Sequence, residues 1–591
     1  MRKLFTKYYT KILTALGVVF ILSLNYAIFR FQSYAVFRDY IIVRDQDIVQ
    51  NSLNPLLFFI EYTQSWLLTL FKPNILSTFT FSSIFSIGFF VIFYSLKKFS
   101  NLLHPELSTL TPKNSLYRNI LPIASTFILM YNPFTLERFF MGQDRVIFGL
   151  FLVVPYLVLI LYFLKKRKEK YLISMLAMSF LLVFVNIHAL VLVLLITLTL
   201  SFLFPGKKLT LLTILNVLLV IVSLILNFNL LNTNTNKYYL ENIANNSNSS
   251  LQIVEAFSLK EKNTENLIIK GITGSASWNT PSFIDIDQII FRLAELGDVS
   301  YYTDNNWAIG FFLYLLMNFG FSVYLLYKSK ISKYKLIFIS ISPFIILYFS
   351  FGMSLGFTKS INQFWYLIPG SYILREPGKV YYLFLSLTVL SVIFSISKIQ
   401  NQFLRKSSII LLTTYAVSGF LPFTQITNSL NYVTIPNIYN YSLSICNNRK
   451  LLYLPDDLYI SPNWSKTFIV NPLHVIKNSK CDVLNYGKIG LLNNNDKEPL
   501  RLESSDVGKK LDEALDKYSL NLPVFDNGTL YVDNQKQKEN INNLLLFLRQ
   551  QKIELLLIDS SQTKNGYNLV TDLNASTTLL KKEGDDYLFQ L

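Results

Sequence analysis

Eleven apolar runs of nearly membrane-spanning length constrain the fold of this chain more than any other feature of its sequence. An α-helix needs roughly 20 predominantly apolar residues to cross the hydrocarbon core of a bilayer. Only 15% of the 591 residues are charged, against about 25% in soluble proteins. We therefore predict an α-helical polytopic membrane protein with about 11 transmembrane helices. The runs cover residues 12–29, 75–96, 119–133, 146–164, 171–187, 189–205, 209–228, 307–327, 336–353, 379–397 and 407–424.

The basic residues between these runs predict the orientation of the chain in a cell membrane. Cytoplasmic loops of membrane proteins carry an excess of lysine and arginine, and a cytoplasmic N-terminus places every basic cluster of this chain on that side. The residues after the eleventh run then lie outside the cell. Such clustering also argues against nucleic acid as the partner that a net charge of +17 suggests. The clusters lie at residues 2–11, 97–98, 113–118, 165–170, 207–208, 328–335 and 398–406.

The residues predicted to lie outside the membrane divide into loops and a terminal domain. Two long outer loops cover residues 30–74 and 229–306 of the transmembrane domain 1–424. Residues 425–591 are rich in Asn, Asp and Lys and mix strand and helix patterns. This mixture predicts an extracytoplasmic α/β domain after the last transmembrane helix.

Three stretches of this C-terminal domain have clear patterns. Residues 450–460 and 527–533 have the composition of strands, and residues 541–561 have the pattern of a helix, a turn and a buried strand. Cys446 and Cys481 share the oxidising side of the membrane, where a disulfide is expected to form, with two free thiols as the alternative.

Polar residues at the outer ends of the apolar runs are the candidates for a functional site, because an ionisable group near a bilayer is costly and is usually paired or functional. They occur in the first outer loop, in NPFTLERFFMGQDR before the fourth run, in REPGK before the tenth run, and in the turn between the fifth and sixth runs. Helix ends of one bundle can converge, so these groups could form one site. The candidates are Asp39, Asp45, Asp47, Glu137, Arg138, Gln143, Asp144, Arg145, His188, Arg375, Glu376 and Lys379.

The two signs of charge suit the two halves of a sugar transfer from a lipid phosphate. A carboxylate can take the proton of an acceptor hydroxyl or, with a second carboxylate, hold a divalent cation. Arginine and lysine can bind the phosphate that leaves. Each group also has a purely structural alternative. The aspartates can belong to a solvated loop, and NPFTLERFFMGQDR can be a turn in which Glu137 pairs with Arg138. REPGK can be the start of a helix, and His188 can make a structural hydrogen bond.

The layout resembles that of the GT-C superfamily of integral-membrane glycosyltransferases. The shared features are a cytoplasmic N-terminus, an acidic first outer loop, many transmembrane helices and an outer C-terminal domain. YNPFTLERFFMGQ and ILREPGK are similar to segments of bacterial and archaeal multi-pass proteins of this type and, distantly, of arabinofuranosyltransferases. YVTIPNIYNY and KKEGDDYLFQL are similar to the C-terminal parts of such proteins. The resemblance covers most of the chain in layout, but only about forty residues in motif.

The resemblance implies a polyprenyl-phosphate-linked sugar as donor, a glycan, lipid or protein as acceptor, and catalysis at the outer face. It assigns Asp45 or Asp47 as the base or as ligand of a divalent cation such as Mg or Mn, and leaves Asp39 as the third candidate. It assigns Arg375, with Lys379, to the lipid phosphate. The remaining candidates for the lipid-phosphate site and its wall are Glu137, Arg138, Gln143 and His188.

Two other classes of function stay open at this point. A transporter or flippase of a lipid-linked precursor predicts internal repeats and broken helices with polar groups near the midplane. A non-catalytic membrane scaffold with an outer binding domain predicts that the aspartates can be replaced without loss. We expect the enzyme, because the sequence has no clear internal repeat, the middles of the apolar runs are nearly free of charge, and the candidate polar residues lie at one face of the membrane.

Overall fold

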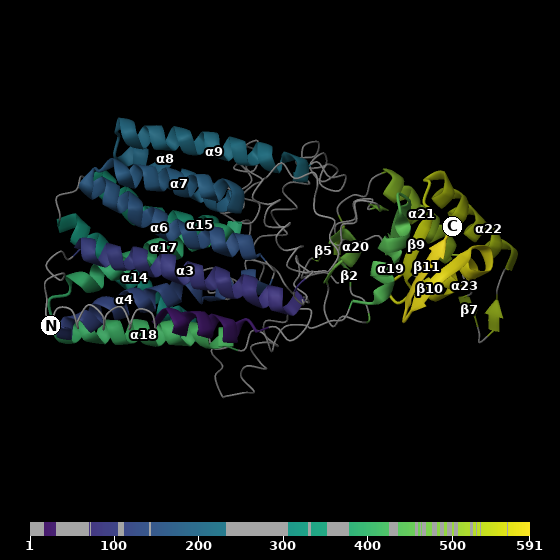
Figure 1. Cartoon of the computed structure of the whole chain (residues 1–591), viewed down its shortest axis with the longest axis horizontal. Helices are drawn as coiled ribbons and strands as arrows, with labels where there is room; N and C mark the ends of the chain where they lie inside the picture. Colours follow the sequence, from purple (N-terminus) through teal and green to yellow (C-terminus); the bar gives the residue numbers. More distant parts are fainter. Residues whose placement is uncertain are drawn as a thin grey trace.

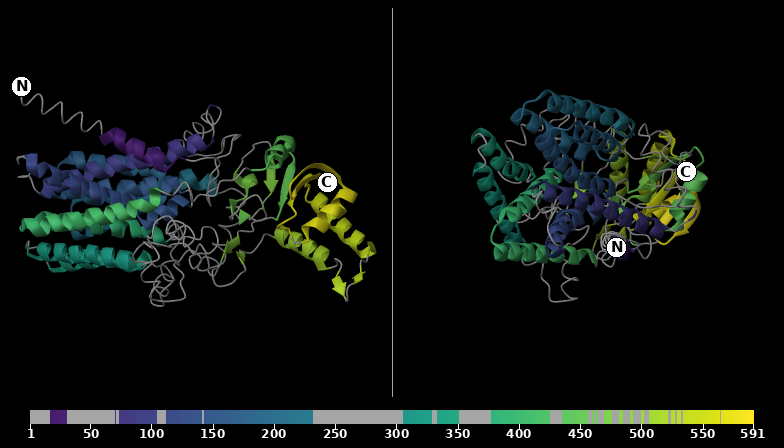
Figure 2. Two further views of the ribbon diagram at one scale, coloured as in Figure 1. Left: turned by 90° about the horizontal axis from the view of Figure 1, so that it is seen from below. Right: turned by 60° about the vertical axis from the view of Figure 1, so that its left-hand side comes forward.

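Long helices make up the described part of the chain before residue 425, and the described strands follow it (Figure 1). The views of Figure 2 show these helices running roughly along one common direction. The computed structural model describes residues 17–30, 70, 73–103, 112–140, 143–231, 305–328, 333–350, 377–424, and most of 435–591.

The helices follow the apolar runs of the sequence, because a segment in a bilayer must satisfy its backbone hydrogen bonds internally. A short 3-10 turn, η3 (Pro377–Val380), leads directly into α17. The helices are Gly17–Ile28, α3 (Pro73–Leu103), α4 (Pro112–Met130), α5 (Pro133–Phe140), α6 (Asp144–Lys166), α7 (Glu169–Val185), α8 (Ile187–Leu203), α9 (Lys207–Leu231), α14 (Asn305–Lys328), α15 (Lys333–Ser350), α17 (Tyr381–Lys398) and α18 (Gln402–Thr424).

Four of the described helices are long and apolar enough to cross a membrane, which agrees with the predicted helical membrane protein. They are Ile75–Leu103, Asp144–Lys166, Lys207–Ile225 and Gly378–Lys398. Shorter apolar helices accompany them at Gly17–Ile28, Asn119–Met130, Ile187–Leu203 and Ser340–Ser350. The number of eleven spans and the side that each helix end faces stay predictions.

Basic residues gather where α3 and α6 end together. The Lys165 ammonium of α6 donates a hydrogen bond to the Leu102 carbonyl of α3 at 2.7 Å. Lys208 at the start of α9 pairs with Glu169 at the start of α7, with 2.6 Å between the Lys208 Nζ and Glu169 Oε1 atoms. We term this the basic end of the bundle. Its residues include Lys97, Lys98, Lys165, Lys166, Arg167, Lys168, Lys170, Lys207 and Lys208.

A buried hydrogen-bond group fixes the first helix against α3 and α4. The Asn25 amide donates to the Ser86 hydroxyl at 3.1 Å and accepts from the Tyr131 hydroxyl at 2.7 Å. All three side chains are buried. Interhelical hydrogen bonds of this kind hold membrane helices together where the hydrophobic effect cannot. Tyr131 is thereby anchored at the point where α4 leads into α5.

The C-terminal residues form a five-stranded mixed sheet in the order β10-β11-β9-β1-β4. β1 is parallel to β4 and β9, whereas β11 is antiparallel to β9 and to β10. The strands of this sheet are β1 (Lys450–Leu454), β4 (Asp482–Leu484), β9 (Leu555–Asp559), β10 (Thr578–Glu583) and β11 (Asp586–Gln590).

Helices pack against both faces of this sheet. Leu451 and Leu555 belong to the core on the side of α19, and Leu452 and Leu556 belong to the core on the side of α22 and α23. Neighbouring residues of a strand point to opposite faces, so the continuous apolar run of β9 is buried on both sides. The helix, turn and strand predicted over 541–561 are observed as the end of α22, a turn and β9. The helices are α19 (Asn437–Cys446), α20 (Pro472–Val475), α21 (Asp506–Leu520), α22 (Asn534–Gln550) and α23 (Gly566–Ser576).

Three two-stranded sheets complete the described part of the C-terminal unit. The strands predicted over 450–460 and 527–533 are observed as β1 with β2 and as β8. The paired strands are β2 (Tyr459–Ile460) with β3 (Ile469–Val470), β5 (Gly490–Leu492) with β6 (Pro499–Arg501), and β7 (Val524–Asp526) with β8 (Thr529–Tyr531).

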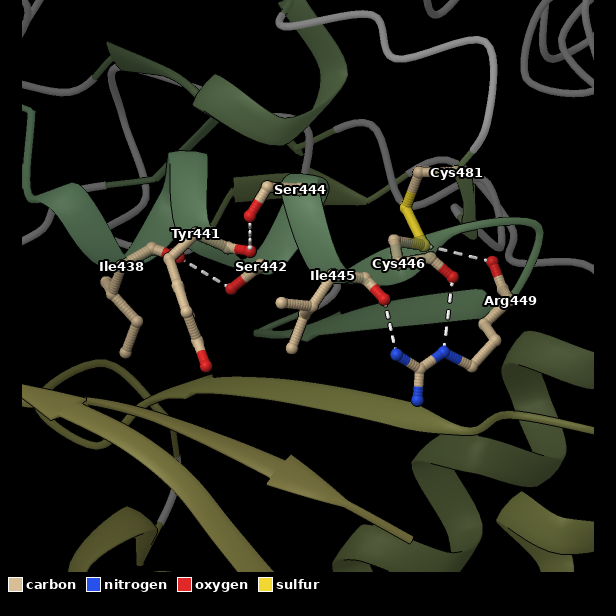
Figure 3. The surroundings of a disulfide bond; sticks show 8 residues. All are labelled: Ile438, Tyr441, Ser442, Ser444, Ile445, Cys446, Arg449 and Cys481. Carbon is tan, nitrogen blue, oxygen red and sulfur yellow. Dashed lines mark hydrogen bonds between the residues drawn. A yellow bond between two sulfur atoms is a disulfide. The ribbon is translucent and has the colours of Figure 1, made fainter.

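A disulfide joins Cys446 and Cys481, with an S–S distance of 2.08 Å (Figure 3). It connects the last residue of α19 to the residue before β4 across 35 positions of sequence. The Arg449 guanidinium donates to the carbonyls of Ile445 and Cys446. A positive charge at these carbonyls also compensates the negative end of the helix dipole.

Replacing both cysteines by serine is expected to destabilise the C-terminal unit by about 2–4 kcal/mol, because the bond restricts the unfolded chain. Hydrogen exchange of full-length protein should show faster exchange in α19 and β4. As a check on the bond in cells, thiols should be alkylated before lysis and the peptides mapped without reduction. A linked pair of peptides carrying Cys446 and Cys481 is expected, and alkylation of both cysteines would contradict it.

Candidate functional site

A short helix, α5, lies where the sequence predicted only a turn between α4 and α6. The Asn132 amide oxygen accepts a hydrogen bond from the backbone amide of Thr135 at 3.0 Å, which caps the helix. Pro133 takes the first helical position, where no amide donor is needed. α6 then begins at Asp144, whose carboxylate accepts from the Arg145 amide at 2.7 Å. The alternative that this stretch forms only a turn is wrong, because Asn132 and Pro133 start a helix.

Arg138 of α5 is completely buried, although it carries a permanent charge. Its Nη1 atom donates to the Gln143 side-chain oxygen at 3.1 Å, and the Gln143 backbone amide donates to the Arg138 carbonyl at 3.0 Å. The guanidinium carbon lies 5.0 Å from the centre of the Phe134 ring. A buried cation needs such partners to offset lost hydration.

Lys379 and His188 meet across 191 positions of sequence, with 3.4 Å between the lysine Nζ and the histidine Nε2 atoms. Lys379 lies in η3 and only 3% of it is exposed. Asn186 caps α8 by accepting from the Ala189 amide at 2.9 Å, which sets His188 in the first turn. An ammonium can only donate, so a hydrogen bond here requires His188 Nε2 to be unprotonated and the ring proton to sit on Nδ1.

Aromatic packing connects these two pairs. The Phe134 ring, beside Arg138, lies 5.8 Å from the ring of Tyr381 and 6.4 Å from that of Tyr382. The Tyr382 ring also lies 6.3 Å from the Phe151 ring of α6. The four aromatic residues are almost completely buried. One aromatic layer therefore joins α5, α6 and the start of α17.

The starts of α6, α8 and α17 lie together at the end of the bundle away from the basic end. A Cβ atom at Gly149 of α6 would lie only 2.6 Å from the Cβ of Asn186, which caps α8. We term this the site end, and the cationic cluster is defined as Arg138, Gln143, His188 and Lys379. A guanidinium and an ammonium in buried surroundings can bind an anion such as a phosphate.

Several residues expected at this site lie outside the described part of the chain, so their positions stay predictions. The residues expected to bind a divalent cation are among them, and no group of three metal-ligating side chains among the described residues could hold a metal. The residues concerned are Asp39, Asp45, Asp47, Arg375, Glu376 and the side chain of Glu137.

The sequence analysis missed an acidic pocket of about 480 Å³ in the C-terminal unit. Its signals are present in the sequence: strand β9 ends in an aspartate, and a Gly-Asp-Asp turn joins β10 to β11. The side chains can accept hydrogen bonds from hydroxyl groups. The lining residues are Ile435, Pro436, Asn437, Asn463, Asp559, Glu583, Gly584, Asp585 and Asp586.

Two of these carboxyl groups lie directly opposite each other. Asp586 of β11 pairs in register with Asp559 of β9, and both are buried. The Tyr439 hydroxyl donates to Asp586 at 3.3 Å, and Ser561 donates to Asp559. Burial, and after it the negative charge of Asp559, raises the pKa of Asp586 from 3.8 to about 8. Asp586 is therefore expected to be mostly protonated at neutral pH.

The C-terminal unit is expected to lose stability as the pH rises, by on the order of 2 kcal/mol between pH 6 and pH 8. The folded state favours protonated Asp586, so this contribution is complete below about pH 4, declines as the pH rises, and is lost above about pH 8. Hydrogen-exchange protection of β11 in the full chain, corrected for intrinsic rates, measures it.

Asp586→Asn should remove most of this dependence, whereas Asp482→Asn, at an exposed position of β4, should keep it. The other carboxyl groups facing Asp586 are Asp559, Asp585 and Glu583. An Asp586→Asn protein with the wild-type pH profile would contradict the raised pKa of Asp586.

No protein-family model matches the chain, and no curated protein matches it significantly.

Proposed function

We propose that this chain is a membrane glycosyltransferase that moves a sugar from a polyprenyl-phosphate donor to a glycan, lipid or protein acceptor at the outer face of the cell membrane. The observation that carries the proposal is the buried Lys379 ammonium beside His188, at the same helix ends as Arg138. A buried cation near a bilayer surface is costly and is usually retained for function. A lipid phosphate combines an anion that an ammonium and a guanidinium can bind with an apolar chain suited to the bilayer.

Two further observations support an outer position for the site. The cationic cluster lies at the ends of α6 and α17 opposite Lys165, Lys166 and Lys398. Because lysine and arginine are enriched on the cytoplasmic side, the basic end is assigned to the cytoplasm and the site end to the outside. α18 begins four residues after Lys398 and therefore runs back toward the site end before the chain enters the C-terminal unit. The disulfide of that unit suits an oxidising compartment.

The proposed reaction gives the described cations a defined task. The acceptor oxygen bonds to the anomeric carbon of the sugar, while the bond from that carbon to the phosphate oxygen breaks. The phosphate leaves with the electron pair, and Lys379 and Arg138 stabilise its growing negative charge. The proton of the acceptor hydroxyl passes to a carboxylate, for which the sequence offers Asp47 or Asp45 in the first outer loop. The products are the glycosylated acceptor and polyprenyl phosphate.

Native mass spectrometry of the protein, gently purified from its own membranes, tests the lipid part of this proposal. Wild-type protein is expected to retain a polyprenyl phosphate or its glycoside, and Arg375→Ala is expected to lose it. Lys398→Ala, at the basic end, is the matched control and should keep the lipid. Bulk phospholipid alone, unchanged by either substitution, would contradict a lipid-phosphate site. A bound lipid without transfer activity would favour a transporter or flippase of the same lipid.

A further inference from the structure

Tyr382 is completely buried, and its hydroxyl has no hydrogen-bond partner among the residues that the structure describes. An unpaired buried hydroxyl lowers stability, and phenylalanine would fill the same space without that cost. Two other completely buried tyrosines of the bundle are paired: the Tyr131 hydroxyl donates to Asn25, and the Tyr156 hydroxyl accepts from Asn216. The Tyr382 hydroxyl therefore needs a partner that packing alone does not supply.

The position of Tyr382 places it at the cationic cluster. It follows Lys379 by three residues, a spacing that puts both on one face of a helix. Helical side chains lean toward the N-terminal end of their helix, which for α17 is the site end. One helical turn rises roughly 5.4 Å, which a tyrosine side chain can span, so we infer that the Tyr382 hydroxyl lies near the level of Lys379. The ring lies between Phe134 and Phe151, at 6.4 and 6.3 Å from their ring centres.

We propose that the Tyr382 hydroxyl donates a hydrogen bond to a phosphate oxygen of the bound polyprenyl phosphate, beside the Lys379 ammonium. This inference rests on the proposed function, and it adds a neutral donor to the cationic cluster. A phosphate offers several acceptor oxygens, so an ammonium and a hydroxyl can bind it together. Lysine carries its charge on a flexible side chain, whereas a tyrosine packed against two aromatic rings holds its hydroxyl group in one orientation. The ligand oxygen would be the partner that the hydroxyl otherwise lacks.

Tyr382→Phe tests this role, because it removes only the hydroxyl. Binding of a fluorescent polyprenyl monophosphate to the full chain in nanodiscs is expected to weaken about tenfold, the effect of one hydrogen bond to a charged group. The apparent unfolding temperature should stay the same or rise, because an unpaired hydroxyl is removed. Tyr131→Phe is the matched control: it breaks the Tyr131–Asn25 hydrogen bond and should lower the unfolding temperature without changing lipid affinity.

The outcomes separate this inference from the proposed function. Wild-type affinity in Tyr382→Phe, with binding lost in Lys379→Met, would overturn the role of the hydroxyl and keep the lipid-phosphate site. Absence of specific binding by the wild-type protein would overturn both. Weaker binding with a lower unfolding temperature would overturn the role as well, since it would mean that the hydroxyl supports the fold.

Discussion

Lys379→Met should weaken binding of a polyprenyl monophosphate about 100-fold, on the order of 3 kcal/mol, and abolish sugar transfer. The ammonium is buried beside His188, so its attraction to a phosphate is weakly screened by water. Methionine has a similar length and no charge, and it suits a buried position. We therefore expect the variant to insert and fold. Binding can be measured with a fluorescent lipid in nanodiscs, and folding by the apparent unfolding temperature.

Two further substitutions complete this experiment. Lys379→Arg keeps the charge and should retain part of the affinity, although the guanidinium differs from the ammonium in shape. Lys398→Met removes a lysine from the other end of the same helix and should leave affinity unchanged. Unchanged lipid binding by Lys379→Met would remove the main support for the lipid-phosphate site.

Gly149→Val is expected to destabilise the bundle by about 2–3 kcal/mol, the cost of overfilling a packed core. An added Cβ would lie 2.6 Å from the Cβ of Asn186 and 3.2 Å from that of Ala189. These Cβ atoms are attached directly to the backbone of α8, so α8 has to move away from α6. His188 should move with it, and lipid affinity is expected to fall together with stability.

Gly320→Val is the matched control, because nothing lies within 4 Å of a Cβ added at that glycine of α14. It should cost little, because the added side chain meets no neighbour and valine has a higher helix propensity than glycine. The apparent unfolding temperature of both variants in the same detergent measures the difference. Equal temperatures would show that α6 and α8 do not pack closely at Gly149.

The helices could be predicted from the sequence because their cause is local. An apolar run in a bilayer satisfies its backbone hydrogen bonds by forming a helix. Neither hydrophobic periodicity nor tertiary contacts are therefore needed to predict the helix. α5 was not predicted as a helix, because it is short and polar on one side. Its local helix signals are Asn132 and Pro133 at its start. The buried strand β9 was predictable for the opposite reason: a continuous apolar run of four residues, Leu555 to Ile558, is short for a helix and typical of a strand covered on both faces.

The candidate site was harder to predict, because its contacts join distant parts of the sequence. Lys379 and His188 were each selected for lying at a helix end, but their contact depends on how α8 and α17 pack. The opposition of Asp559 and Asp586 depends on the register of two strands, which single-sequence patterns do not give. The aspartates of the first outer loop that we propose as catalytic lie outside the described residues, so their positions stay predictions.

Release of polyprenyl phosphate is the most direct test of the central claim, because this product does not depend on which sugar or acceptor is used. Purified protein in nanodiscs should be incubated with a panel of polyprenyl-phosphate-linked sugars and an extract of its own membranes as acceptor. The proposal predicts acceptor-dependent release from at least one donor by the wild-type protein. It predicts no release by Lys379→Met, and none by at least one of the two variants Asp47→Asn and Asp45→Asn. If the wild-type protein binds a donor lipid but releases no polyprenyl phosphate from any of them, the chain is not a glycosyltransferase of this kind.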